Sequence, residues 1–302
     1  MTIGFGMSQP KCGGHALGKA TEAERKKALD AHGIRSWSPS NIGLAKTCLS
    51  TWCAKYVFKL RDRTGAAMAR GNAVESVIRG YLALAPSERE GSEDELIAAA
   101  LAEFDLAELN GNPEPDKWVK ERKNVEKIAQ QMLPKFAEYP VPNWHPPNRF
   151  GKHEKYVETQ IEGAAAAIGG FTDFDWDGAS VQLTGDAKTR GSALLKDKAT
   201  GGWIVPYNNR LQFEVYIRAL GNREFRGFYG WPSGSAFLSV ERSEEVWRDV
   251  QRTVHALEQF LAISHDKEEL LALLPPPDFS HAYLFSDLHF KDQVKQLYGI
   301  KE

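Results

Sequence analysis

A proline-rich segment in the middle of the chain separates two kinds of sequence. Tyr139–Pro147 holds four prolines in nine residues, and proline both fixes its own backbone and removes a hydrogen-bond donor. We therefore predict a connector here, since neither a helix interior nor a central strand accommodates such a run. Helical patterns precede the connector and strand patterns dominate after it, which favours an α/β or α+β class.

Helices are expected throughout the first half. Ser38-Pro39-Ser40 is typical of a helix start, because serine caps a helix and proline is tolerated in its first turn. The other helical patterns cover Glu22–Ala31, Ala66–Leu84, Glu93–Glu108 and Pro115–Glu138.

The second half alternates strands and helices. Asp177-Gly178 and Ser233-Gly234 are turn signals that predict two hairpins. Asn208 or Asn209 is expected to cap a helix that ends at Leu220. The predicted strands are Lys155–Glu162, Ile168–Trp176, Ala179–Thr189, Arg226–Pro232 and Ser235–Glu241, and a last long helix covers Glu244–Ile263. After three prolines at 275–277 we expect an irregular, aromatic-rich tail.

Composition sets outer limits on function. The chain has 302 residues and a formal net charge of −2, so no global basic field indicates nucleic acid, although a basic groove can be local. Its three cysteines, Cys12, Cys48 and Cys53, do not form a disulfide framework, which predicts a reducing cytoplasm. No run of 18 apolar residues predicts a membrane span, and residues 1–19 lack the apolar segment of a secretory signal.

The residues most suggestive of chemistry lie on the first predicted hairpin. Asp186 and Lys188 are two apart on one strand, so both point to one face. Asp173 lies on the partner strand, nearer to the turn than Asp186. We therefore expect a diagonal offset, or a bulge at Gly185, to bring the two carboxylates together. Such groups on a core face are costly unless a divalent cation neutralises them.

Phosphodiester hydrolysis requires this mixture of groups. Carboxylate oxygens suit Mg²⁺, and one or two such ions activate water and neutralise the phosphate. Lys188 is expected to position the attacking water or to stabilise charge on the phosphate. Glu75, on the helix after Ala66, would add a carboxylate. Gln212 and Tyr216 are spaced i and i+4, so one helix face carries both toward the site.

These motifs carry a family resemblance over roughly residues 37–245. Asp173 with Asp186-Ala187-Lys188 resembles the D…(D/E)-x-K pattern of the PD-(D/E)XK nuclease superfamily. Gln212-xxx-Tyr216 resembles the Q-xxx-Y motif of its RecB-like branch, and Gly71-xxx-Glu75 occupies the place of that branch's first motif, with Glu where many relatives carry His. Ser38-Pro39-Ser40 through Lys55–Phe58 is similar to its helical lead-in.

The resemblance implies a restriction-endonuclease-like core, in which helices flank a central mixed sheet, preceded by a helical elaboration. It also implies DNA as substrate and Mg²⁺ or Mn²⁺ as cofactor. Asp173 and Asp186 would bind the metal, assisted by Glu75 and by the backbone carbonyl of Ala187. Lys188 would be the catalytic lysine, supported by Gln212 and Tyr216.

We accordingly expect a stand-alone DNA exonuclease of the phage or RecB-like kind, acting in recombination, repair or phage DNA processing. A structure-specific endonuclease and a non-cleaving DNA-binding recombination accessory are the alternatives, and a homo-oligomer or a partner protein remains open. Phage encoding would place it in the host cytoplasm. The expected divisions are an arm at 1–36, partly disordered, a helical region at 37–150, the nuclease core at 151–265 and a tail packed on that core at 266–302.

DNA contacts are expected near the motifs. Arginine suits phosphate contacts and aromatic rings stack on unpaired bases; the candidates are Arg190, Arg210, Arg218, Trp203 and Tyr207. Surface charge and core packing explain these residues equally well. Similar ordinary roles exist for the motif residues: an exposed strand pair for Asp186 and Lys188, and helix-surface positions for Glu75, Gln212 and Tyr216. Glu158 is a secondary candidate.

Two further patterns are dismissed. Gly13–Lys19 has the spacing of a phosphate-binding loop, but Ala20 replaces the hydroxyl residue and no apolar strand precedes it, so we expect no nucleotide site. Cys48 and Cys53 have no later cysteine to complete an iron–sulfur cluster, and none is expected.

Overall fold

The computed structural model describes residues 19–148, 151–178, 182–221 and 223–300. Its helices are α1 (Glu22–Ala31), α2 (Pro39–Thr47), α3 (Leu49–Tyr56), α4 (Ala66–Ala83), α5 (Glu93–Leu109), α6 (Pro115–Phe136), α7 (Tyr207–Leu220), α8 (Glu244–Leu261), α9 (Lys267–Ala272) and α10 (Leu288–Leu297), with a short 3₁₀ turn at Pro86–Glu88. Its strands are β1 (Lys155–Thr159), β2 (Ile168–Thr172), β3 (Phe174–Asp177), β4 (Gln182–Thr189), β5 (Glu224–Trp231) and β6 (Gly234–Ser239).

Four strands form the central sheet in the spatial order β3-β4-β5-β6. The β3–β4 and β5–β6 pairs are antiparallel, whereas β4 and β5 are parallel. A parallel pair needs a crossover connection, and α7 supplies it. β1 and β2 form a separate antiparallel ribbon. The predicted α/β class, with a mixed sheet flanked by helices, is confirmed.

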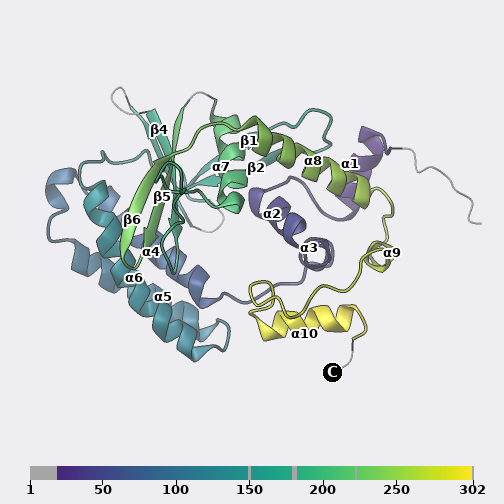
Figure 1. Cartoon of the computed structure of the whole chain (residues 1–302), viewed down its shortest axis with the longest axis horizontal. Coiled ribbons are helices and arrows are strands. Elements are labelled where there is room, and N and C mark those ends of the chain that lie inside the picture. Colours follow the sequence, from purple (N-terminus) through teal and green to yellow (C-terminus); the bar gives the residue numbers. More distant parts are fainter. Residues whose placement is uncertain (1–18, 149–150, 179–181, 222, 301–302) are drawn as a thin grey trace, which may run out of the picture.

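Helices cover both faces of this sheet (Figure 1). α4, α5 and α6 lie on one face, and α7 lies on the other with α2 and α8 packed against it. Strand alternation produces the division, because successive side chains point to opposite faces. Leu183 and Phe228 join the buried cluster on the α4–α6 side, whereas Phe225 and Tyr229 join the cluster on the α7 side.

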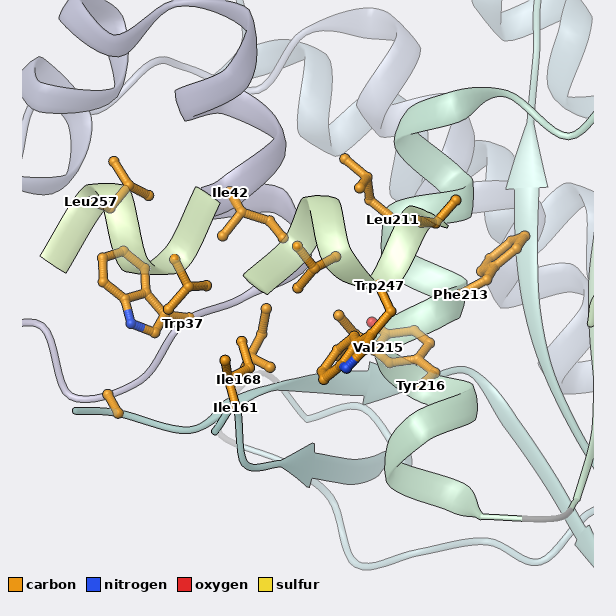
Figure 2. Packing of buried hydrophobic residues seen from close by; sticks show 14 of the residues in the cluster. Trp37, Ile42, Ile161, Ile168, Leu211, Phe213, Val215, Tyr216, Trp247 and Leu257 are labelled. Atoms are coloured by element: carbon orange, nitrogen blue, oxygen red, sulfur yellow. The ribbon is translucent and has the colours of Figure 1, made fainter. Parts of the chain in front are cut away.

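The cluster on the α7 side holds distant segments together. Trp37, next to α2, lies beside Ile168 of β2 (Figure 2), and the two residues form a backbone bridge. Glu258 of α8 is fully buried here, and its carboxylate accepts hydrogen bonds from the Trp37 indole and from Arg25 of α1, both at 3.1 Å. The backbone N–H of Ala165 donates to the same carboxylate at 2.9 Å. This buried acid therefore fixes α1, α2 and α8 against the ribbon.

The expected helix start at Ser38 is confirmed. Its side chain accepts the N–H of Asn41, and Pro39 is the first helical residue. The expected asparagine cap of α7 is wrong, because that helix begins one residue earlier, at Tyr207. Pro206 precedes it in an extended conformation and makes no side-chain cap.

The first predicted hairpin is wrong in its register. The strand predicted over 168–176 breaks at Asp173, so that β2 pairs with β1 whereas β3 pairs with β4. Asp177 still pairs with Gln182, which makes the connection four residues long, and residues 179–181 of it lie outside the described part. Asp177, the last residue of β3, also forms an ion pair with Arg223. In the second hairpin Trp231 pairs with Gly234, so the turn is Pro232-Ser233.

The corrected register changes the relation between the two aspartates. Phe174 pairs with Gly185, so Asp173 and Asp186 occupy the next opposed positions. Neither a diagonal offset nor a bulge at Gly185 is needed. A glycine is required at 185 for another reason, since a side chain there would collide with the ring of Phe228.

The tail differs from the expected irregular segment. It contains α9, whose Leu270 joins the α7-side cluster, and α10, which packs on α3 rather than on the sheet. Phe290 and Val294 of α10 are fully buried there. The boundaries expected at 36, 150 and 265 stay predictions, and residues 1–18 of the expected arm lie outside the described part. Among the described residues, no helix has both the length and the apolar character that crossing a bilayer requires.

One arginine joins the ends of two helices on the α4–α6 side. Arg89 is 1% exposed and donates to backbone carbonyls at the C-terminal ends of α4 and α6, where the regular i+4 helical donors are missing. These acceptors are Tyr81 and Leu84 at 3.1 Å, Phe136 and Ala137 at 2.9 Å, and Tyr139 at 2.6 Å. A cation at this position also interacts favourably with the negative C-terminal ends of the two helix dipoles.

We expect Arg89→Met to lower the free energy of unfolding by about 2–4 kcal/mol, because several buried carbonyls lose their donor. Urea denaturation would measure this loss, provided that the dependence of the unfolding free energy on urea concentration is the same in the variant and the wild type. Arg122→Met is the matched control: its ion pair with Asp105 is exposed, with side chains 47% and 46% accessible, and such pairs contribute below about 1 kcal/mol. Equal losses in the two variants would contradict the role assigned to Arg89.

Candidate active site

Asp186 and Lys188 lie on the face of β4 that α7 covers. The Asp186 carboxylate is 1% exposed and contacts the Lys188 ammonium directly. Burial alone would lower the pKa of Lys188, but the Asp186 and Asp173 carboxylates raise it above its ordinary value. Lys188 is therefore a charged group held at the site.

Asp173 lies at the junction between β2 and β3. Its carboxylate accepts the backbone N–H of Ala187 at 2.7 Å. This bond places Asp173 beside the strand that carries Asp186 and Lys188. The sequence thus predicted correctly that these three residues come together.

The two aspartates disfavour one another's charge. Desolvation, together with the carboxylates of Asp186 and Glu75, raises the pKa of Asp173 well above its ordinary value. Burial raises the pKa of Asp186 in the same direction, although Lys188 opposes the shift. Two interacting acids in one desolvated site hold a proton more tightly than either would in water.

A second acidic group adjoins them. Carboxylate oxygens of Glu75 on α4, Glu154 just before β1 and Asp173 all lie within 4.8 Å of one another. Three hard oxygen donors at this separation fit a divalent cation such as Mg²⁺ or Mn²⁺. Glu75 was expected here, but Glu154 was missed.

Glu154 could have been found from strand pairing. Lys155 pairs with Thr172, so Glu154 comes opposite Asp173 when the β1–β2 register is extended by one residue. The residue chosen instead, Glu158, is exposed, lies opposite Gly169 and accepts a hydrogen bond from Tyr156 at 3.2 Å.

Two cations balance the acidic group. Lys152 contacts Glu75 at 2.9 Å and Glu154 at 3.6 Å, and Arg79 contacts the same two acids at 2.9 and 3.5 Å. Burial alone would lower the pKa of Lys152, but Glu75 and Glu154 raise it. Lys152 therefore stays charged and neutralises carboxylates that a metal ion would otherwise neutralise.

α7 contributes Gln212 and Tyr216 as expected. The Gln212 amide donates to Asp186 at 3.3 Å and to the Tyr216 hydroxyl at 2.9 Å. Burial and the nearby Asp186 raise the pKa of Tyr216 well above its ordinary value, so the phenol stays protonated. Gly170 permits this approach, because a Cβ there would lie 2.8 Å from the Tyr216 oxygen.

The acidic group opens into a cleft of about 680 Å³. Its walls come from α2 and the residues just before it, the β1–β2 ribbon, α7 and the tail. Lining residues include Ser38, Ser40, Tyr156, Phe171, Asn208 and Tyr283.

The residues expected to contact DNA lie elsewhere: none of the five is among the described residues that line this cleft. Arg218 is bound to Glu214 at 2.7 Å and Glu244 at 2.6 Å. Trp203 packs edge-on against Trp231, with ring centroids 5.3 Å apart. The other three have partly or fully exposed side chains: Arg190, Arg210 and Tyr207. Their DNA contacts stay predictions.

The two dismissed patterns give little further information. Cys12 and residues 13–18 lie outside the described part. Burial raises the pKa of Cys53 to about 12, so this thiol stays protonated.

Removing the Lys152 charge tests the electrostatic balance. We expect Lys152→Met to lower the melting temperature of the metal-free protein by about 2–6 °C, because the carboxylates then repel one another with one cation fewer. Saturating Mn²⁺ should recover the loss and stabilise the variant more than the wild type.

The control for this experiment is Lys117→Met. Lys117 pairs with Glu114 on the surface and its side chain is 59% exposed, so both melting temperatures should match the wild type. If Mn²⁺ stabilised Lys152→Met and the wild type equally, Lys152 would have no part in neutralising the site.

The raised pKa values predict how metal binding depends on pH. A proton held by Asp173 and Asp186 competes with the cation, so affinity should increase as pH rises from about 3.8 through the raised pKa of the pair. Calorimetric titration of Mn²⁺ in two buffers of different ionisation enthalpy should show proton release. An affinity independent of pH, with no proton released, would contradict the shared proton.

Comparison with known proteins agrees with this geometry. A family model described as the PD-(D/E)XK nuclease superfamily matches residues 36–281. No curated protein sequence matches the chain. Among solved structures the chain is similar to SSO0001, with 14% identity over 72% of this chain and 92% of that chain and a TM-score of 0.30. It is also similar to Scheffersomyces stipitis Rai1, solved with (3'-NADP)+ and a calcium ion, with 15% identity over 83% of this chain and 72% of that one and a TM-score of 0.25.

Structural similarities at this level carry no argument about activity, and the RecB-like branch stays a prediction. The family match is different, because it spans most of the chain and includes Glu75, Asp173, Asp186 and Lys188. This chain therefore belongs to the PD-(D/E)XK nuclease superfamily, with a restriction-endonuclease-like core.

Proposed function

We propose that this nuclease is a divalent-metal-dependent deoxyribonuclease that removes nucleotides from DNA ends. The observation that carries the proposal is the convergence of one lysine and four carboxylates, three of which line one cleft. These residues are Glu75, Glu154, Asp173, Asp186 and Lys188.

Glu75, Glu154, Asp173 and Asp186 are the residues that would hold Mg²⁺ or Mn²⁺. The Ala187 carbonyl is a further candidate, because the N–H and C=O of one strand residue point to the same side and its N–H points to Asp173. The bound ion would supply an activated water and would neutralise charge on the scissile phosphate.

The side chains around the metal ligands have separate tasks. Lys188 is charged and held by Asp186, so it can attract the phosphate and orient the attacking water. Gln212 fixes Asp186 through its amide, and Tyr216 fixes Gln212 in turn. Packing and hydrogen bonds thus hold the lysine and both acids before substrate arrives, which reduces the reorganisation needed during the reaction.

The size and walls of the cleft favour a strand end over a duplex. A volume of about 680 Å³ is typical of pockets for small-molecule ligands, which corresponds to few nucleotides. α2 and the tail residue Tyr283 line the cleft together with the ribbon. Because α2 lines the cleft, this N-terminal helix can guide a DNA strand to the site.

The test is degradation of end-labelled linear and circular DNA, single- and double-stranded, with Mg²⁺, with Mn²⁺ and with EDTA. We expect linear DNA to shorten from its ends only with metal, while single-stranded circles stay intact. Lys188→Ala should reduce the rate by about 10²- to 10⁴-fold, the range for losing an electrostatic or proton-transfer group. Lys117→Ala is the matched surface control and should match the wild type.

Two outcomes would overturn this proposal. Cleavage of single-stranded circles would make the protein an endonuclease. Absence of cleavage of every DNA with both metals would leave a binding protein without nuclease activity, provided that circular dichroism shows it to be folded.

A further inference from the structure

One face of the β1–β2 ribbon carries two successive cross-strand pairs of different chemistry. Tyr156 pairs directly with Phe171. Glu154 and Asp173 occupy the next opposed positions on the same face, because each is two residues along its strand from the aromatic partner. An aromatic pair thus adjoins the carboxylates of the active site.

Both rings are accessible from the cleft. Tyr156 is 46% exposed, Phe171 is partly exposed, and both line the cavity together with Glu154 and Asp173. Their ring centroids are 5.1 Å apart with an interplanar angle of 58°. Neither ring belongs to one of the buried hydrophobic clusters that the described residues form, so their position beside charged ligands suggests a binding role.

The orientation of Tyr156 is fixed by its neighbours. Its hydroxyl donates to Glu158, two residues along the same strand, at 3.2 Å. Opposite Glu158 stands Gly169, where an added Cβ would lie 2.9 Å from the Tyr156 oxygen. The glycine therefore leaves room for the ring to lie along the ribbon, and the hydrogen bond holds the ring there. Binding a ligand then costs little side-chain conformational entropy.

The spacing between the two pairs exceeds the rise of one stacked nucleotide and suits an unstacked strand. Two residues along a strand span about 6.6–6.8 Å. Successive phosphates of a stacked strand are about 3.4 Å apart along the helix axis, and an unstacked strand extends farther. A phosphate at the carboxylates therefore leaves the base of a neighbouring unstacked nucleotide within reach of the aromatic pair.

We propose that Tyr156 and Phe171 form a stacking platform for an unpaired nucleobase next to the scissile phosphate. The inference rests on the proposed nuclease function and adds its substrate class: single-stranded DNA, or a duplex end that has frayed. In an intact duplex each base is stacked on its neighbours, so the platform receives only a base that has left the stack. Every base has a π face, which makes this contact tolerant of sequence.

The first experiment measures binding without cleavage, in a Lys188→Ala background with Mg²⁺. We expect Tyr156→Leu to weaken the binding of a short single-stranded oligonucleotide by about 5- to 100-fold, the range for one base–aromatic stack. Tyr156→Phe keeps the ring and loses only the hydrogen bond to Glu158, so its affinity should stay closer to the parent than that of Tyr156→Leu. Phe171→Leu gives an independent variant, and thermal melting checks that each folds. Affinity for a blunt duplex with closed ends should not change.

The second experiment identifies the stacked base. Abasic sites are placed singly at the first positions of the oligonucleotide, and one of them should cost the parent protein the same factor as Tyr156→Leu. That cost should vanish in Tyr156→Leu, because ring and base form one interaction, as a double-mutant cycle measures.

Equal sensitivity of parent and Tyr156→Leu to every abasic site would overturn the platform, as would unchanged binding by both leucine variants. These results are independent of cleavage. If the protein cuts DNA but its binding does not depend on the rings, the nuclease function stands and the platform is refuted. If it binds DNA through the rings but never cuts, the platform stands and the nuclease function is refuted.

Discussion

The arrangement of the active site depends on the hydrogen bond from the Ala187 backbone to the Asp173 carboxylate. At Asp173 the chain leaves the β1–β2 ribbon and enters the central sheet, so this N–H has no strand partner on that side. An unpaired buried N–H would be costly. The carboxylate replaces the missing strand and in doing so aligns the ribbon with β4. The same alignment positions Glu154 and the aromatic pair, because the β1–β2 register fixes where they lie relative to Asp173.

Close approach of two helices completes the site from opposite sides of the sheet. α4 passes close to the end of β4 at Gly71, where a Cβ would lie 3.4 Å from the Thr189 hydroxyl, and Glu75 follows one turn later. Arg70 secures this crossing through Thr189, at 3.3 Å to its carbonyl. On the other side, Gly170 admits the Tyr216 hydroxyl. Gly71 and Gly170 thus have a packing explanation at the points where helix and strand meet.

Local sequence patterns predicted the elements better than the pairing between them. The order of helices and strands and the meeting of Asp173, Asp186 and Lys188 followed from periodicity, turn signals and the family motif. The register of the first hairpin did not, because the Asp177-Gly178 signal is local, whereas Asp177 is paired with Gln182 and bound by Arg223, which lies after α7.

Glu154 and the aromatic pair were missed for a related reason. Their positions depend on how β1 pairs with β2 across residues 160–167, and no pattern within either strand contains that register. Trp203 and Tyr207 were chosen because they were expected in the loop before the helix that became α7, although Tyr207 is the first residue of that helix. Trp203 instead packs against Trp231, and the Tyr207 hydroxyl bonds to Asp249 of α8. Their position in the sequence suggested that they lie near the site, but their tertiary contacts are with Trp231 and Asp249.

The charges at the site connect metal binding with attraction of substrate. Among the described residues that meet there, four are acids and three are cations: Glu75, Glu154, Asp173 and Asp186, against Arg79, Lys152 and Lys188. The pKa values of Asp173 and Asp186 are both raised, and one proton shared by this pair would bring the set close to neutrality. Exchange of that proton for a divalent ion would leave a local excess of positive charge, which suits a singly charged phosphodiester. A chain with a net charge of −2 can in this way attract DNA where the metal is bound, without a basic surface elsewhere.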